Sequence, residues 1–149
     1  MTGITTDTGI EIDRDFAAAP ADVFAAWTTP EAFARWFGGD QVQVPLDSLD
    51  YQAEQGRSWS ATMVLPDGNT IAWTGEFVEV SPVSRLVLTM TDQPAAEGRA
   101  TITVDLTATE AGTRMHFTQT TPGFTAEQRE GVLAGWQGFM DVLQQVVEG

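Results

Sequence analysis

Alternation of apolar and polar residues constrains the fold of this chain more than any other feature. Between Gly9 and Phe16, the side chains of Ile10, Ile12 and Arg14 point to one side and three acidic side chains point to the other. Segments of the same period follow at Ser58–Leu65, Thr70–Val80, Arg85–Thr91 and Thr101–Thr109 and after Gly112, with a weaker one at Val42–Leu49. Such segments are typical of strands with one buried and one wet face. The pattern predicts a sheet of about six to seven antiparallel strands.

Two short helices are predicted directly after the first strand. Pro20 opens the first and Pro30 opens the second, and proline is favoured at the first position of a helix. Gly38 and Gly39 end the second helix. The sheet is therefore interrupted once near its beginning and then continues with turns alone.

The last predicted element is one long helix from Thr125 to Val147. Thr125 is a suitable N-cap, with Gln128 three residues later. Its apolar stripe consists of Val132, Trp136, Phe139, Met140, Leu143, Val146 and Val147. At about 1.5 Å per residue the helix is about 34 Å long, and no other element is long enough to cover the dry face of the sheet. The predicted α+β fold is a curved sheet wrapped around this helix.

Three glycines within that helix are unusual. Gly131, Gly135 and Gly138 each cost about 1 kcal/mol relative to alanine in a helix interior. Their spacing predicts that backbone, sheet or a ligand comes close to the helix there.

Composition limits the classes of protein that this chain represents. We expect residues 1–149 to form one domain, with residues 1–8 as a flexible N-terminus, in a soluble cytoplasmic protein without membrane insertion. With no Cys and one His, neither thiol chemistry nor a metal or other cofactor is expected. Seven Arg, no Lys and a net charge of -14 argue against a nucleic-acid partner. The acidic residues are dispersed, as on a solvated surface.

Short motifs along the chain resemble those of a known family. In chain order they are Arg14-Asp15-Phe16, Ala19-Pro20, Val23-Phe24, Trp27, Pro30, Arg35-Trp36-Phe37, Asp67-Gly68, Gly75-Glu76-Phe77, Glu79-Val80, Pro82, Gly112-Thr113 and Gly135-Trp136. With them the chain resembles the START-like (SRPBCC) helix-grip superfamily, which includes the birch-pollen allergen. Within that superfamily it is similar to the bacterial homologues of the activator of a heat-shock-protein ATPase.

The resemblance implies an apolar internal cavity between the sheet and the long helix. A hydrophobic or amphipathic small molecule bound in that cavity is the first functional hypothesis. A cyclase or hydrolase that uses inward polar residues is the second, and a co-chaperone-like protein-interaction module is the third. The resemblance leaves a homodimer and a protein client open as partners.

The candidate ligand-binding residues are inward aromatic and methionine side chains together with one arginine. They are Arg14, Trp36, Phe37, Trp59, Met63, Trp73, Phe77, Met90, Met115, Phe117, Trp136 and Met140. Core packing is the alternative role for each of the apolar ones. Trp36 and Phe37 either fill one end of the core or form a lid hinged at Gly38 and Gly39.

Two polar residues have an unusual place in the pattern. Arg14 lies on the inward face, and a buried guanidinium needs a carboxylate or carbonyl partner. We expect Glu76 or Glu79 as that partner, with an anchor for an anionic ligand as the alternative. His116, the only histidine, falls on the wet face, which argues against a catalytic role.

Overall fold

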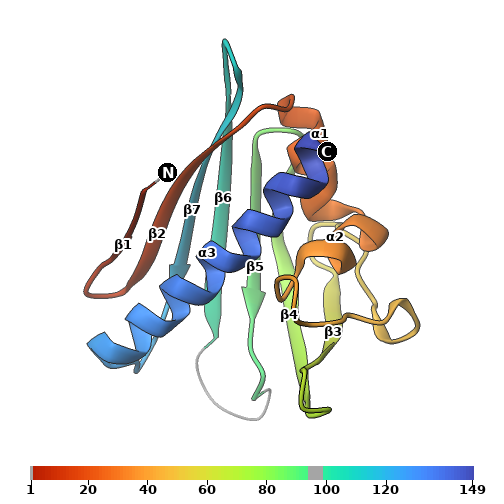
Figure 1. Ribbon diagram of the computed structural model, residues 1–149, viewed down its shortest axis with the longest axis vertical. Helices are drawn as coiled ribbons and strands as arrows, with labels where there is room; N and C mark the ends of the chain where they lie inside the picture. The colour runs from red at the N-terminus through yellow and green to blue at the C-terminus, as the bar shows by residue number, and fades with distance from the viewer. Residues whose placement is uncertain (1, 94–98) are drawn as a thin grey trace.

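The computed structural model describes residues 2–93 and 99–149 and is shown as a ribbon in Figure 1. Its strands are β1 (Thr2–Thr5), β2 (Gly9–Phe16), β3 (Ser58–Val64), β4 (Thr70–Ser81), β5 (Arg85–Met90), β6 (Ala100–Thr109) and β7 (Gly112–Thr120). Its helices are α1 (Pro20–Thr28), α2 (Pro30–Trp36), the 3-10 turn η1 (Leu46–Ser48) and α3 (Ala126–Glu148). From residue 9 onward the predicted order of elements is confirmed: a strand, two short helices, a run of strands and one long helix.

The strands form a single seven-stranded sheet in the order β1-β2-β7-β6-β5-β4-β3. Every neighbouring pair is antiparallel. The long helix α3 crosses one face of this sheet diagonally, and α1 and α2 pack against it (Figure 1). The predicted α+β architecture, a sheet covered by the C-terminal helix, is therefore confirmed.

Strand register places the apolar positions on the helix-facing side. Trp59 and Ala61 of β3 are opposite Gly75 and Trp73 of β4, so all four share the inner face. On β7, Met115 and Phe117 alternate with exposed or half-buried residues and are themselves fully buried. Hydrophobic burial of about 25 cal/mol per Å² of apolar surface selects this register, because a slip of one residue would turn every inner side chain outward.

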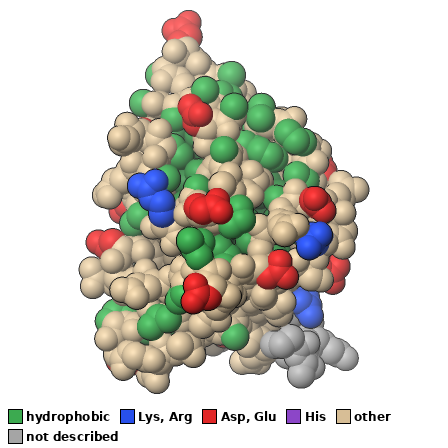
Figure 2. Space-filling model, turned by 90° about the vertical axis from the view of Figure 1, so that its right-hand side faces the viewer, with side chains coloured by type: hydrophobic (Ala, Val, Ile, Leu, Met, Phe, Trp, Pro, Cys, Tyr) green, Lys and Arg blue, Asp and Glu red, His purple; other side chains and the backbone are tan. Residues whose placement is uncertain are grey.

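The outer face of the sheet is wet and carries cross-strand ion pairs. Arg114 Nε lies 2.8 Å from Asp15 Oδ1, and Arg85 Nη1 lies 2.7 Å from Asp105 Oδ1. The hydrogen bond from Arg114 lowers the pKa of the Asp15 carboxyl below its usual value. On the side of the molecule drawn in Figure 2, acidic side chains are scattered and do not gather into one region. This agrees with the solvated acidic surface that the sequence predicts.

Two local predictions are wrong. Residues 2–5, expected to be flexible, form β1 and pair with β2, with Gly3 opposite Ile12. Gly3 lies against α3 there: a Cβ would come within 2.5 Å of the flexible end of Gln137 and 3.0 Å of Leu133 Cδ1. The weak strand expected at Val42–Leu49 is a loop with one bridge, between Gln43 and Val64, followed by η1. The pattern of residues 2–5 is too short to decide its structure, and Pro45 within the second segment lacks the backbone N–H that a strand ladder needs.

Among the described residues, no helix is both long enough and apolar enough to cross a membrane.

Candidate functional site

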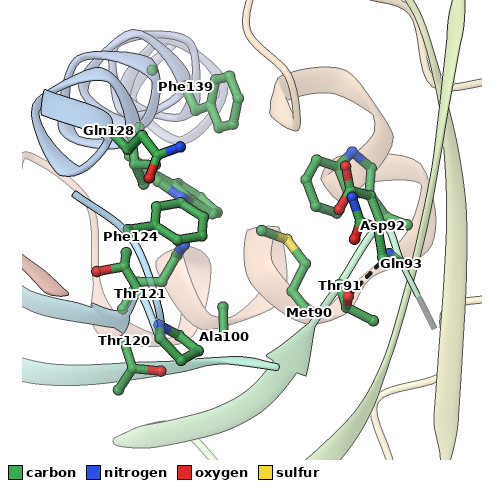
Figure 3. Close-up of a pocket in the computed structure, with 16 residues that line it drawn as sticks. Met90, Thr91, Asp92, Gln93, Ala100, Thr120, Thr121, Phe124, Gln128 and Phe139 are labelled. Atoms are coloured by element: carbon green, nitrogen blue, oxygen red, sulfur yellow. Dashed lines mark hydrogen bonds between the residues drawn. The ribbon is translucent and has the colours of Figure 1, made fainter. Parts of the chain in front are cut away.

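One pocket of about 570 Å³ opens between the sheet and the N-terminal half of α3. It lies where β5 and β7 end and β6 begins, with Trp73 of β4 as a further wall. Figure 3 shows Phe124, Gln128 and Phe139 on one side and Met90, Asp92 and Gln93 on the other, with open space between them. Pockets that hold small molecules commonly have volumes of about 300–1,000 Å³.

The walls of the pocket are mainly apolar. The apolar lining residues are Trp73, Met90, Ala100, Pro122, Phe124, Val132, Trp136 and Phe139. Phe124 is 42% exposed and lies at the rim, whereas Trp136 is almost fully buried. The pocket is thus a half-open apolar recess that ends against the core.

Polar residues lie mostly around the edges of the pocket. They are Thr91, Asp92, Gln93, Gln119, Thr120, Thr121 and Gln128. Among the described lining residues, Asp92 is the only ionisable one. The side chain of Gln128 accepts a hydrogen bond from the Thr125 backbone N–H as part of the capping box that begins α3. Within residues 2–93 and 99–149, the walls therefore present no cation that would pair with an anionic ligand.

Two polar atoms in the pocket walls are buried and have no hydrogen-bond partner among the described residues. They are the acceptor Oε1 of Gln119 and the donor Nε1 of Trp73. Gln119 is only 5% exposed. Trp27 Nε1 is in the same situation, but Trp27 belongs to the aromatic core and does not line the pocket. A buried polar atom without a partner costs about 1–3 kcal/mol, so these two atoms mark where a ligand has most to gain.

Of the twelve candidate ligand-binding residues, three line the pocket. These are Trp73, Met90 and Trp136. The apolar residues that do not line it are buried in the core: Trp36, Phe37, Trp59, Met63, Phe77, Met115, Phe117 and Met140. At these eight positions the space between the sheet and the helices is filled by side chains, and the pocket lies beside the N-terminal half of α3. That Trp73, Met90 and Trp136 bind a ligand stays a prediction.

Trp36 and Phe37 fill the core and do not lie at the pocket. Both are at most 1% exposed. Trp36 Nε1 donates to the Ala26 carbonyl of α1 at 2.8 Å, and the Trp36 ring meets Trp27 edge-on with 4.7 Å between centroids. Edge-on aromatic pairs of this kind stabilise beyond their buried area. The packing alternative therefore accounts for both residues.

Trp136 separates the aromatic core from the pocket. Its ring centroid lies 4.7 Å from that of Phe117 in the core and 5.0 Å from that of Phe139, which lines the pocket. Its position on α3 belongs to the predicted apolar stripe that faces the sheet. A ligand in the pocket would rest on the other side of this ring.

Arg14 is buried as predicted, but its partner is different. The Arg14 side chain is 2% exposed, and its Nη1 lies 2.9 Å from Asp141 Oδ1 and 3.5 Å from Gln144 Oε1, both on α3. Glu79 instead lies 3.4 Å from Arg85, and Glu76 is exposed. Arg14 does not line the pocket. It ties β2 to α3 and does not anchor a ligand there.

His116 lies on the outer face of the sheet, as its place in the alternation predicts. Its Nδ1 is 2.6 Å from Asp13 Oδ1, and its Nε2 is 3.8 Å from Glu11 Oε1. The sheet separates it from the pocket. Within residues 2–93 and 99–149, no three His, Asp or Glu side chains come together as a metal-binding group. The described part of the pocket holds one carboxyl group and no paired acid and base.

The prediction that backbone or sheet comes close to the three α3 glycines is wrong, whereas closeness to a ligand stays a prediction. A Cβ added to Gly131, Gly135 or Gly138 would have nothing within 4 Å, so neither backbone nor sheet comes close to them. Gly135, however, lines the pocket, whereas Gly131 and Gly138 do not. Of the three interpretations offered by the spacing, only closeness to a ligand remains, and only for Gly135.

The sequence prediction overlooked Gln119, Phe124 and Phe139 as site residues. A signal existed for Gln119, because it follows Met115 and Phe117 in the same phase and is therefore inward on β7. No pattern singles out Phe124, since it lies in the connection between β7 and α3. Its place at the rim depends on how that connection folds over the end of the sheet.

The fold and the site together define the class of protein. A seven-stranded antiparallel sheet around a long C-terminal helix, with an apolar pocket between them, is the START-like helix-grip architecture. The chain belongs to the family described as activator of Hsp90 ATPase homolog 1-like protein, whose model matches residues 17–148. The resemblance noted in the sequence is thus confirmed. No protein of curated function matches the chain.

Solved structures of similar proteins share this fold over nearly the whole chain. One from Chromobacterium violaceum is 21% identical with a TM-score of 0.82, over 99% of this chain and 97% of that one. An AHSA1-like protein from Aeromonas hydrophila is 23% identical with a TM-score of 0.76, over 99% and 92%. An AHSA1 protein from Silicibacter pomeroyi is 20% identical with a TM-score of 0.80, over 97% and 96%. At such identities the likeness shows the fold alone.

Proposed function

We propose that this protein binds an apolar or amphipathic small molecule in the pocket between α3 and the ends of β5, β6 and β7. The observation that carries the proposal is a recess of about 570 Å³ with mainly apolar walls, left open beside the buried hydrophobic core. Leaving aromatic walls such as Phe124 and Phe139 in contact with water costs free energy, which a bound apolar molecule would recover.

The enzymatic alternative has less support from the site. It depends on Arg14 and a nearby Glu converging on the ligand, whereas Arg14 pairs with Asp141 outside the pocket. A general acid and base need two titratable groups within reach of one substrate. Asp92 is the only such group among the described lining residues.

The co-chaperone alternative rests on the family description, which names an activator of the Hsp90 ATPase. Such a role needs a surface on which a partner protein docks, and specific docking surfaces usually have an apolar centre. On the outer sheet face, β2 presents Glu11, Asp13 and Asp15 and β7 presents Arg114 and His116. This polar surface on β2 and β7 favours the pocket as the functional site.

Binding of a neutral apolar dye such as Nile red tests the proposal. Gly135→Leu would place a side chain in the pocket, since Gly135 lines it and a Cβ there meets no other atom within 4 Å. We expect dye fluorescence titrations to show affinity reduced about tenfold or more in this variant, because the new side chain occupies the ligand's volume.

Gly131→Leu is the matched control. Gly131 has the same free space and lies on the same helix, but it does not line the pocket. The control should bind the dye as the wild type does. Equal binding by all three proteins, or no binding by any of them, would contradict the proposed function.

A further inference from the structure

Gln119 occupies a position on the inner face of the sheet where its neighbours are apolar. Its register partners are Ile10 on β2 and Ile102 on β6, and both are 1% exposed. Phe117, two residues earlier on β7, is fully buried on the same face. An amide in such surroundings is destabilising unless it is hydrogen-bonded. The position is therefore unfavourable for this residue type unless something in the pocket bonds to it.

The amide oxygen of Gln119 is an unsatisfied acceptor buried in the wall of the pocket. Its Oε1 has no hydrogen-bond partner among the described residues, and the side chain is 5% exposed. Trp73 Nε1, an unsatisfied buried donor, lies on β4, which is separated from β7 by β5 and β6. A pure hydrocarbon in the pocket would leave both atoms without partners. The chemistry of the walls calls for an occupant that is apolar over most of its surface but carries a polar group.

The charges of the pocket and of the chain indicate which kind of polar group the ligand carries. Asp92 is the only ionisable residue among the described lining residues, and the chain as a whole carries a net charge of -14. A ligand carboxylate or phosphate would lose hydration without gaining a cationic partner among the described lining residues. A neutral hydroxyl group loses much less hydration, and its proton can be donated to an amide oxygen.

We propose that the ligand of this pocket is an uncharged apolar molecule bearing a hydroxyl group, which donates its proton to Gln119 Oε1. This inference rests on the proposed function and adds the chemical class of the ligand. The apolar body of the molecule lies against Trp136 and Phe139, and a rotation of the Gln119 side chain turns Oε1, which is buried in the pocket wall, toward the hydroxyl group.

Matched naphthalene probes test the inference without knowledge of the natural ligand. Naphthol carries the hydroxyl donor, methoxynaphthalene replaces it with an ether that accepts but cannot donate, and naphthoate is the anionic analogue. We expect calorimetric titration of the wild type to show naphthol bound about tenfold more tightly than methoxynaphthalene, and naphthoate bound most weakly.

Gln119→Leu removes the acceptor and keeps a side chain of similar size among apolar neighbours. In this variant we expect the preference for naphthol over methoxynaphthalene to fall to about one, with unsubstituted naphthalene bound at least as tightly as by the wild type. Gln145→Leu makes the same substitution at an exposed position of α3 that does not line the pocket, and it should retain the wild-type preference.

The outcomes separate this inference from the proposed function. If naphthalene and Nile red bind but naphthol is no tighter than its methyl ether in the wild type, the hydroxyl requirement is overturned and the binding function stands. The hydroxyl requirement is likewise overturned if Gln119→Leu keeps the preference. If no probe of any kind binds, both the binding function and the inference fail. The wild-type comparison decides the question even if Gln119→Leu does not fold.

Discussion

Tyr51 is a buried phenol whose ionisation is coupled to folding. Its hydroxyl donates to the Trp27 carbonyl at 2.6 Å, and its ring stacks on Phe33 with 4.0 Å between centroids. Burial raises the pKa of the Tyr51 phenol above its usual value. Because the folded state holds this proton more tightly than the unfolded chain, its contribution to stability is complete below about pH 10 and is lost as pH rises further.

The composition makes this effect measurable for a single residue. The chain has one Tyr, no Cys and no Lys, so no other side chain titrates between about pH 9 and 12. We expect the free energy of unfolding to fall by about 1.4 kcal/mol per pH unit above about pH 10. Urea unfolding over a pH series measures it.

Tyr51→Phe is the control for that series. It should lose stability at neutral pH, by about 1 kcal/mol for the lost hydrogen bond to Trp27, but show no further loss from about pH 9 to 11. A variant with the same alkaline slope as the wild type would mean that another process causes the slope.

The Arg14–Asp141 pair is the second prediction at the residue scale. Arg14 is 2% exposed and Asp141 is 65% exposed, so removing the acid leaves the charge of Arg14 buried with a weaker set of partners. We expect Asp141→Ala to reduce the free energy of unfolding by about 2 kcal/mol. Arg14→Met, which removes the buried charge itself, should cost less.

The double variant completes the comparison. Arg14→Met with Asp141→Ala should be close in stability to Arg14→Met alone, because no buried charge is left to compensate. Denaturant unfolding of the wild type, the two single variants and the double variant gives the coupling free energy between Arg14 and Asp141. If Asp141→Ala costs less than Arg14→Met, the pair is not what compensates the buried guanidinium.

At the scale of elements, α3 has a complete N-terminal capping box but residues of low helix propensity in its interior. Thr125 and Gln128 form a reciprocal capping box, and Trp136, Met140 and Leu143 are buried against the sheet. Gly131 and Gly138 contribute no contact that an alanine would disturb. The helix is therefore held by its cap and its buried stripe, and these two glycines lower its stability without a packing role.

Alanine substitutions in α3 test this account. We expect Gly131→Ala and Gly138→Ala each to raise the free energy of unfolding by about 0.5–1 kcal/mol, since each reduces the conformational freedom of the unfolded chain. Thermal and urea unfolding measure the change, with Thr125→Ala as an opposite control that should lose about 1 kcal/mol. A loss of stability in either glycine variant would reveal a close contact that the structure does not show.

At the scale of the whole molecule, the net charge of -14 is the dominant long-range term. Exposed ion pairs such as Arg114 with Asp15 offset only part of it, because seven basic residues face 21 acidic ones. Like charges spread over a compact surface repel one another and destabilise the folded state. Added salt screens this repulsion, since the Debye length falls from about 30 Å at 0.01 M to about 8 Å at 0.15 M.

We therefore expect the thermal midpoint to rise when NaCl is added from low to physiological concentration. KCl should act in the same way at equal concentration, because screening does not depend on the identity of the ion. Calorimetry at a fixed neutral pH measures the shift. A falling midpoint would mean that the surface ion pairs stabilise the fold more than the net repulsion destabilises it.

Prediction from sequence works for this chain where a local period decides the outcome. The alternation in Gly9–Phe16 predicts β2 with its observed bounds, and Thr125 predicts the start of α3 to the residue. It fails where the partner lies on a distant element. Asp141 pairs with Arg14 because α3 packs against β2 beside Arg14. The residues around position 14 carry no information about where a helix distant in the sequence will pack.

The sequence by itself determined most of the strands, the order of the elements, the dry face of the sheet and the helix that covers it. It could do so because the periods of strands and helices depend on residues that are close together in the chain. Only the tertiary structure decided which aromatic residues fill the core and which line open space. Trp36 and Trp73 were both candidates for the pocket, yet one is fully enclosed and the other lines it. The reason is that a cavity is the volume left over after all side chains are packed, and this depends on every element at once.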